Sequence, residues 1–304
     1  MDFRTSINFN QSSCRFESKE VNLSEKMEVP LSVILQITRQ CDLSCVFCSE
    51  TEKMPDPSYE QLQKMKNNLA GVARIYLSGG EPLLRKDLPE ILDLFYGNFI
   101  IGLPTNAIKI TSDLAKILKD KIDFANVGLD GPRNVTTRLR GSYDRILRGI
   151  DVLKNFNIPI SLSCVVLSST TDSILLTCQI ADLLDAKKLK LILPIKKGNA
   201  LDLPDVEYLK IKESEMLFER VTIAKEKYGW RPTITLTTWG LEVEGYSLLV
   251  YPDGNAYAWP VYDQKDKILL LGNLISEPIK DIWARNPFKE NHYKKYLGRS
   301  ILVV

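Results

Sequence analysis

Apolar residues follow two alternating patterns along most of the chain. Short apolar runs predict strands, and between them apolar positions recur with helical spacing. The predicted strands are Ser32–Thr38, Arg74–Leu77, Phe99–Leu103, Phe124–Gly128, Ile160–Leu167 and Leu189–Pro194. The predicted helices lie near Tyr59–Leu69, Leu88–Tyr96, Thr111–Lys119, Tyr143–Phe156 and Thr171–Leu184. This alternation predicts an α/β fold of parallel strand-helix repeats, a partial (β/α)6 barrel that is open on one side.

A different pattern follows position 200. It contains a helical segment, three alternating segments, a strand end and a short helix: Val206–Tyr228, Thr233–Thr237, Tyr246–Tyr251, Ala256–Trp259, Leu271–Leu274 and Ile279–Trp283. The pair Asp253-Gly254 predicts an antiparallel hairpin, because an Asp-Gly turn matches the twist of paired strands. We expect three parts: a lead-in over 1–30, the barrel over 31–200 and a small α+β extension over 201–304.

Composition narrows the function classes. Of 304 residues, 40 are Lys or Arg and 38 are Asp or Glu, which gives a formal net charge of +2. Such a chain lacks the strong field that recruits nucleic acid or acidic membranes, so a peptide or small-molecule substrate is the better prediction. Met1–Asn10 shows no basic start followed by an apolar run, and no apolar stretch is long enough to span a membrane. We expect a soluble, cytoplasmic protein.

Three of the six cysteines lie within one short segment, at Cys41, Cys45 and Cys48. Clustered thiols suit a metal site in a reducing compartment. Four thiolates close a cubane iron-sulfur cluster, so a trio leaves one iron open to a ligand that is not protein. A zinc site would also need a fourth ligand, and the motifs described next would have no role in it. The separated cysteines are interpreted as buried apolar residues: Cys14, Cys164 and Cys178.

A second group of polar residues follows the predicted strands. The turn Ser78-Gly79-Gly80-Glu81-Pro82 comes after the second strand, as the cysteine segment comes after the first. Loops at the carboxyl ends of parallel strands converge on one mouth, so the two segments are expected to face each other. The turn can offer backbone amides and the Glu81 carboxylate to an amino-acid-like ligand, which we interpret as S-adenosylmethionine.

With these motifs the chain resembles the radical S-adenosylmethionine (radical SAM) superfamily, in its branch with SPASM or twitch C-terminal extensions. That branch includes anaerobic sulfatase maturases, peptide-modifying maturases and the enzyme that starts molybdenum-cofactor assembly. The resemblance covers most of the chain after Pro30 and extends through motifs in the expected order. Beyond the cysteines and Gly79-Gly80-Glu81-Pro82 these are Pro104-Thr-Asn-Ala107, Gly128-Leu-Asp-Gly-Pro132, Leu139-Arg-Gly141, Lys196-Lys-Gly-Asn-Ala200, Tyr251-Pro-Asp-Gly254, Gly272-Asn273 and Ile282-Trp283.

The resemblance implies specific roles. Cys41, Cys45 and Cys48 would hold a [4Fe-4S] cluster whose fourth iron binds the amino and carboxylate groups of S-adenosylmethionine. The expected contacts of S-adenosylmethionine are Phe47 at the adenine, Glu81 at the amino group together with the turn residues Gly79 and Gly80, Thr105, Asn106 and Asp130 near the ribose or methionine, and Arg140 at the carboxylate. The reduced cluster would cleave this ligand to a 5′-deoxyadenosyl radical, which abstracts hydrogen from a substrate carbon. An electron donor such as flavodoxin or ferredoxin is implied.

Two departures from the family pattern stand out. Relatives usually carry serine where Gly128 stands, which removes a ribose contact. Relatives also carry cysteines for auxiliary clusters in the extension, where this chain has none and Trp259 occupies the first such position. We therefore predict a single cluster. No general acid or base is identified, and the only histidine, His292, is interpreted as a surface residue.

Three functions are compatible with this sequence. The leading hypothesis is a radical SAM enzyme that modifies a peptide or protein side chain, because SPASM-like extensions often go with peptide substrates. The second is an enzyme of the same superfamily that dehydrogenates, decarboxylates or rearranges a small molecule. The third is a catalytically silent protein that binds S-adenosylmethionine or a cluster.

Overall fold

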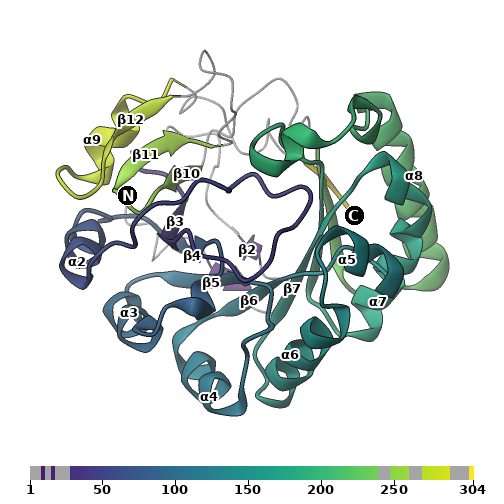
Figure 1. Cartoon of the computed structure of the whole chain (residues 1–304), viewed down its shortest axis with the longest axis horizontal. Coiled ribbons are helices and arrows are strands. Elements are labelled where there is room, and N and C mark those ends of the chain that lie inside the picture. The colour runs from purple at the N-terminus through teal and green to yellow at the C-terminus, as the bar shows by residue number, and fades with distance from the viewer. Residues whose placement is uncertain (1–7, 11–14, 18–27, 239–246, 260–268, 288–300) are drawn as a thin grey trace.

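The computed structural model describes residues 8–10, 15–17, 28–238, 247–259, 269–287 and 301–304. In it one curved sheet of eleven strands carries its helices on the outer side (Figure 1). Its central strands are β3 (Ser32–Thr38), β4 (Arg74–Gly79), β5 (Ile100–Thr105), β6 (Phe124–Gly128), β7 (Ile160–Val165), β8 (Lys188–Ile192) and β9 (Thr233–Thr237). These seven strands are neighbours in chain order, and each pairs in parallel with the next. The predicted α/β fold with a parallel sheet is confirmed.

The helices between these strands also match the sequence pattern closely, apart from the helix over Arg133–Leu139, which was not predicted. They are α2 (Tyr59–Asn67), α3 (Leu88–Phe95), α4 (Ser112–Lys121), α5 (Arg133–Leu139), α6 (Tyr143–Asn155), α7 (Ile174–Leu183) and α8 (Ile211–Tyr228). The start of α2 is fixed by a capping box. The Gln61 backbone amide donates to the Ser58 hydroxyl, and the Ser58 backbone amide donates to the Gln61 side chain. The end of α8 is fixed by Gly229, whose φ of 64° suits a left-handed cap.

Short elements escaped the sequence prediction. Helix α5 begins after Pro132 without a side-chain cap, and its polar sequence has no helical periodicity of apolar residues. The strands β1 (Asn8–Asn10), β2 (Arg15–Glu17) and β13 (Ile301–Val303) have three residues each, too few for a pattern. The 3-10 turns η1 (Pro82–Leu84), η2 (Ser168–Ser173), η3 (Gly198–Asp202) and η4 (Asp205–Glu207) complete the connections.

The strand Thr233–Thr237 differs from its expected place. The sequence pattern assigned it to the extension, whereas β9 pairs in parallel with β8 and extends the barrel sheet by a seventh parallel strand. Its other neighbour is β13, which runs antiparallel at that edge. The predicted division of the chain at position 200 stays a prediction.

The opposite edge of the sheet carries the predicted hairpin. Strands β10 (Ser247–Val250) and β11 (Asn255–Ala258) are antiparallel, and β12 (Leu270–Asn273) adds to β11. Strand β10 pairs in parallel with β3, the strand that leads into the cysteine segment. The final helix, α9 (Ile279–Ala284), is fixed to the core where the Ile279 amide donates to the Asn68 carbonyl at 2.8 Å. The extension is therefore continuous with the barrel beside the first strand.

Candidate functional site

The three cysteines lie on a loop without regular secondary structure between β3 and α2. Cys41 is exposed, Cys48 is half-buried and Cys45 is buried. The Val46 amide donates to the Leu139 carbonyl at 3.0 Å, and the Cys48 amide to the Cys45 carbonyl at 3.1 Å. The first bond ties the loop to the end of α5, and the second closes a turn within the loop.

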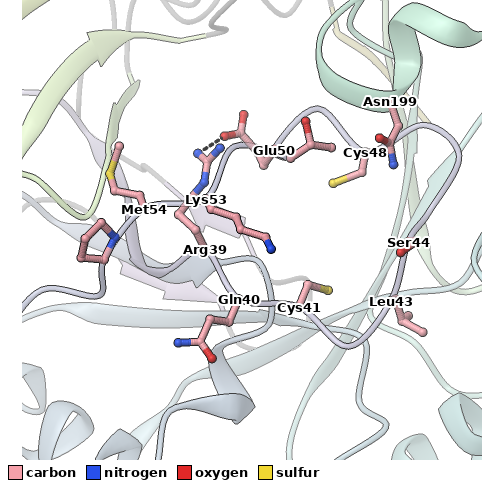
Figure 2. Close-up of a pocket in the computed structure, with 12 residues that line it drawn as sticks. Arg39, Gln40, Cys41, Leu43, Ser44, Cys48, Glu50, Lys53, Met54 and Asn199 are labelled. Atoms are coloured by element: carbon pink, nitrogen blue, oxygen red, sulfur yellow. Dashed lines mark hydrogen bonds and ion pairs between the residues drawn. The ribbon is translucent and has the colours of Figure 1, made fainter.

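A cavity of about 750 Å³ opens at this loop. Figure 2 shows the Cys41 and Cys48 side chains at this cavity, with Lys53 reaching across it. Its lining residues are Arg39, Gln40, Cys41, Leu43, Ser44, Cys48, Glu50, Thr51, Lys53, Met54, Pro55 and Asn199. Among the described residues, no three His, Cys, Asp or Glu side chains are gathered closely enough to hold one metal ion. Cys41 and Cys48 line this cavity, whereas Cys45 is not among its lining residues.

Two thiols of the loop, those of Cys41 and Cys45, have raised pKa values. Burial raises the pKa of Cys45 to about 11, although the nearby Arg140 guanidinium opposes this rise. Burial also raises the pKa of Cys41. Metal ligation needs thiolates, so binding of iron here would release protons and depend on pH.

The Gly79-Gly80 turn packs against the start of the cysteine loop. A Cβ atom at Gly79 would lie 2.1 Å from the Thr38 carbonyl oxygen, and one at Gly80 would lie 2.2 Å from the Gln40 carbonyl oxygen. The Gly80 amide donates to Thr38 at 2.9 Å and the Glu81 amide to Gln40 at 2.7 Å. These two amides are thus already engaged, which corrects the expectation that the turn exposes them to a ligand. Glycine is required here for close backbone approach.

Glu81 is a buried carboxylate without a cation. Its side chain accepts hydrogen bonds from the Thr105 hydroxyl at 2.7 Å, the Asn106 amide at 2.7 Å and the Leu83 amide at 3.1 Å. Within the described part of the chain no Lys or Arg forms an ion pair with it. Burial raises the pKa of Glu81 to about 7, although these three hydrogen bonds oppose the rise. An added positive charge would restore its ordinary ionisation.

Asn106 connects the Glu81 region to the cysteine loop. Its side-chain amide donates to the Asp42 carboxylate at 2.8 Å, one residue after Cys41. Thr105 and Asn106 end β5 and Glu81 follows β4, so neighbouring strand ends position all three. The structure therefore brings together the expected residues from the first three strand ends.

Asp130 and Arg140 form an ion pair on the other side of the loop, in which Asp130 is fully buried. Asp130 accepts hydrogen bonds from Arg140 Nε at 2.9 Å and Nη2 at 3.1 Å, and from the Val165 amide at 3.0 Å. The Arg140 guanidinium lies 5.1 Å from the centre of the Phe47 ring. It also fills the space beside Gly128, where a Cβ atom would meet Arg140 Nη1 at 2.5 Å. Arginine therefore occupies the volume that a side chain at position 128 would need.

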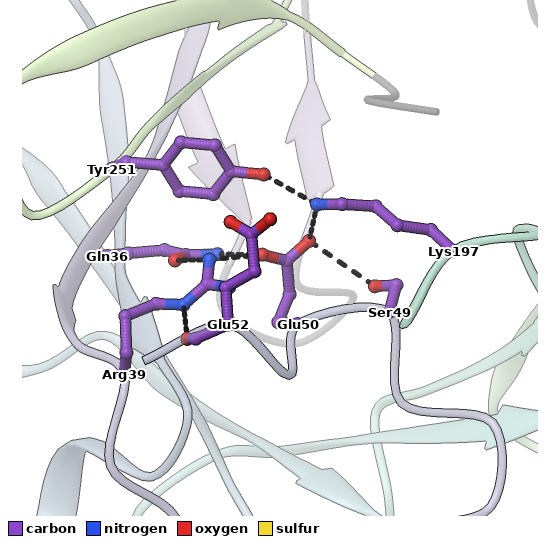
Figure 3. Close-up of polar contacts among 7 residues, drawn as sticks. All are labelled: Gln36, Arg39, Ser49, Glu50, Glu52, Lys197 and Tyr251. Atoms are coloured by element: carbon purple, nitrogen blue, oxygen red, sulfur yellow. Dashed lines mark hydrogen bonds and ion pairs between the residues drawn. The ribbon is translucent and has the colours of Figure 1, made fainter. Parts of the chain in front are cut away.

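A polar cluster at the loop was not predicted as part of the site. It consists of Gln36, Arg39, Glu50, Lys197 and Tyr251, which Figure 3 shows around the Glu50 carboxylate. Lys197 and Tyr251 stood within motifs of the family resemblance, but nothing in the sequence separated Lys197 from its neighbour Lys196. Their shared contact could be found only in three dimensions.

The remaining predicted features are buried or half-buried side chains, and two residues lie outside the described ranges. Cys164 and Cys178 are buried as expected, and their raised pKa values reflect that burial. Trp259 is half-buried against the pair Leu249 and Tyr251. Cys14 and His292 lie outside the described residues. A search of the described helices found none with the length and apolar character needed to cross a membrane.

Comparison with known proteins agrees with this geometry. Residues 35–178 match the model of the Radical SAM superfamily. A probable GTP 3′,8-cyclase from Methanopyrus kandleri is 30% identical over 175 residues, which is 54% of this chain and 57% of that protein. The chain spans about half the length of the curated relatives it matches.

Solved structures share the fold over most of the chain. SuiB of Streptococcus suis bound to the precursor peptide SuiA matches with a TM-score of 0.71 at 14% identity, covering 88% of this chain and 67% of SuiB. Native anSMEcpe with bound AdoMet and the Cp18Cys peptide matches with a TM-score of 0.69 at 21% identity, covering 87% of this chain and 82% of that one. At such identities the likeness establishes the fold.

Proposed function

We propose that this chain, whose residues 35–178 form a radical SAM domain, is an enzyme that cleaves S-adenosylmethionine at one [4Fe-4S] cluster and abstracts hydrogen from a substrate carbon. Cys41, Cys45 and Cys48 would hold the cluster at the cavity that Cys41 and Cys48 line. Three thiols fit a cluster with one open iron. When bound, the cluster supplies the electron that converts S-adenosylmethionine to methionine and a 5′-deoxyadenosyl radical.

The observation that carries this proposal is Glu81. A carboxylate that is 1% exposed and has only neutral donors is costly to ionise, and it gains a partner when an ammonium group enters. The amino group of S-adenosylmethionine is such a cation. Thr105 and Asn106 hold the carboxylate in position, and Asn106 also fixes Asp42 at the start of the cysteine loop.

The opposite side of the loop would receive the rest of the ligand. Phe47 offers an aromatic face beside Arg140, and its place before Cys48 supports a contact with adenine. Arg140 is fixed by Asp130, so the donors at its Nη1 atom are held in one orientation, which supports a contact with an anionic or hydroxyl group. The side chains of Asp130 and Arg140 thus act as one unit. Gly79 and Gly80 would contribute through close backbone packing.

For the substrate we propose a peptide or protein side chain. Support comes from SuiB and anSMEcpe, which share the fold and whose structures hold peptides. A small molecule is the second candidate, and it is supported by the sequence relative described as a probable GTP 3′,8-cyclase. Flavodoxin or ferredoxin would supply the electron in either case.

The test is anaerobic reconstitution with iron and sulfide, followed by iron counting and an assay of 5′-deoxyadenosine after dithionite and S-adenosylmethionine are added. The wild type should bind about four irons and form product. The combined variant Cys41→Ala, Cys45→Ala, Cys48→Ala should do neither, while Cys178→Ala, which alters a buried thiol away from the loop, should keep both.

Other outcomes would change the proposal. About eight irons per chain would contradict a single cluster. Four irons without product would favour the catalytically silent binding protein. To separate peptide from small-molecule substrates, the same assay would compare product formation with precursor-like peptides and with GTP, since a true substrate accelerates cofactor cleavage.

A further inference from the structure

We propose that Lys197, Gly198 and Asn199 form a clamp that positions the cysteine loop, and that the extension supports this clamp through Tyr251. The inference rests on the proposed function in one respect, which is that this loop holds the cluster. Residues far apart in the chain make the clamp, since 147 positions separate Glu50 from Lys197 and 54 separate Lys197 from Tyr251.

Asn199 contacts the main chain of two of the three cysteines. The Asn199 amide donates to the Cys48 carbonyl at 2.9 Å, and the Asn199 side chain donates to the Cys45 carbonyl at 3.0 Å. One residue thus satisfies both carbonyls. Because both bonds end on main-chain atoms of cysteines, movement of Asn199 would move the thiols.

Gly198 allows this close approach. Its φ of 59° lies in the left-handed region, and a Cβ atom there would lie 2.6 Å from the Cys48 carbonyl oxygen. A side chain at position 198 would therefore be strained and would push the loop away. The requirement for glycine shows that the segment and the loop are packed against each other at the backbone.

The side chain of Lys197 fixes the far end of the loop. Its ammonium donates to Glu50 Oε1 at 2.7 Å and to the Tyr251 hydroxyl at 2.6 Å, while only 9% of the side chain is exposed. Although burial alone would lower the pKa of Lys197, Glu50 and Tyr251 raise it, so the ammonium stays charged. The Lys197 ammonium also lies 5.2 Å from the centre of the Tyr251 ring.

Glu50 has a second cationic partner, Arg39, which directly follows strand β3. Arg39 Nη1 donates to Glu50 Oε2 at 2.5 Å, and Gln36 Nε2 donates to the same oxygen at 3.2 Å. The carboxylate is therefore held between strand β3, where the loop begins, and the clamp (Figure 3). Two cations around one carboxylate leave a net positive charge at the edge of the cavity.

The clamp has a defined consequence for the cluster. The loop has no regular secondary structure, so its shape depends on the bonds at its edges. Groups that orient metal ligands from outside typically change metal affinity or activity about 10-fold or more when removed. Loss of Lys197 should therefore loosen the loop, speed iron loss and, because a cation is removed, lower the reduction potential of the cluster.

The test compares Lys197→Met with Lys197→Arg and with Lys196→Met as the matched control. Lys196 is the adjacent residue, is exposed and pairs with Asp205 at the surface. Two measurements are made: hydrogen exchange of the 41–50 amides in the chain without cluster, and iron release to a chelator from the reconstituted chain. We expect Lys197→Met to speed both about 10-fold, Lys197→Arg to restore part of the loss, and Lys196→Met to match the wild type.

A variant of Tyr251 provides a further check. Tyr251→Phe removes only the hydroxyl, so it should give a smaller acceleration in the same direction without unfolding the chain. The clamp would be refuted if Lys197→Met kept wild-type exchange and wild-type iron release, or if Lys196→Met changed them equally. Hydrogen exchange is measured in the chain without a cluster, so it tests the clamp independently of iron binding. If the wild type and every variant failed to bind iron, this would count against the proposed function, and the exchange data would still test the clamp.

Discussion

Two carboxylates border the cysteine loop, and their surroundings are opposite. Glu50, on the side of the extension, accepts hydrogen bonds from the cations of Arg39 and Lys197. Glu81, on the side of the sheet, accepts three hydrogen bonds from neutral groups and has no ion pair within the described residues. Glu50 is paired with two cations of the protein, whereas Glu81 has no cationic partner among the described residues.

This difference separates a structural role from a binding role. A buried charge with its partners in place is costly to disturb and gains nothing from a ligand. A buried charge without a partner is costly as it stands and becomes favourable when the ligand brings the partner. Glu50 therefore stabilises the loop, and Glu81 is prepared for a cation. Substitution of the two residues should have effects of different kinds.

The largest expected effect is on stability, from Glu50→Gln. This substitution leaves Arg39 and Lys197 close together without their counterion, which should lower the free energy of unfolding by about 3 kcal/mol. Urea denaturation at pH 7 in the absence of cluster measures it. Asp205→Asn, which removes the surface partner of Lys196, is the control and should cost at most about 0.5 kcal/mol. Equal losses in the two variants would contradict the structural role of Glu50.

The second prediction concerns pH and the chain without ligand. The pKa of Glu81 rises from 4.5 to about 7 on folding. Since the folded state binds this proton more tightly than the unfolded state, its contribution to stability is fully present below pH 4.5 and is lost as pH rises towards 7 and above. At about 1.4 kcal/mol per pKa unit, the loss is about 3 kcal/mol.

Unfolding of the wild type and of Glu81→Gln should be measured across this range of pH. Other groups titrate in both proteins, so the difference between their curves isolates Glu81. That difference should change steadily between pH 4.5 and about 7. A constant difference would show that Glu81 ionises normally in the folded chain.

The third prediction concerns ligand binding by Glu81→Gln. The amide cannot form a charge-assisted bond with an ammonium group, so S-adenosylmethionine should bind more weakly by about 2 kcal/mol, or about 30-fold. Calorimetry on the reconstituted chain measures this loss. Asp113→Asn, which alters an exposed carboxylate at the start of α4, should leave the affinity unchanged. Unchanged affinity in Glu81→Gln would remove the central support for the proposed site.

The smallest effect is expected near Asp130, a fully buried carboxylate that is paired with one cation. Gly128→Ser would place its Cβ atom against Arg140, whose guanidinium is held by Asp130. Overpacking of this kind should cost about 1 kcal/mol of stability. In a double-mutant cycle with Arg140→Met, the cost of Gly128→Ser should shrink, because the blocking group is gone. A cost that persists in the double variant would place the clash elsewhere.

Local sequence patterns were enough to predict the order of the strands and helices in the sheet. Strands such as Ser32–Thr38 and Phe124–Gly128 were predicted with their observed bounds, because runs of outward-facing apolar residues must be buried beneath helices. The sequence also located the cysteine trio and Glu81 at the ends of adjacent strands, since parallel repeats bring those ends to one edge. These features depend on local pattern and on the direction of the chain.

The pairing of charges, in contrast, became visible only in three dimensions. The contact of Glu50 with Lys197 joins residues 147 positions apart, and no pattern within either segment specifies the other. The filling of the space at Gly128 by Arg140 likewise depends on how α5 returns to the sheet. Strand β9 belongs to the sheet because its apolar face completes the core beyond β8. Ion pairs and packing contacts depend on distances between residues that are far apart in the chain, and those distances are set only when the chain folds.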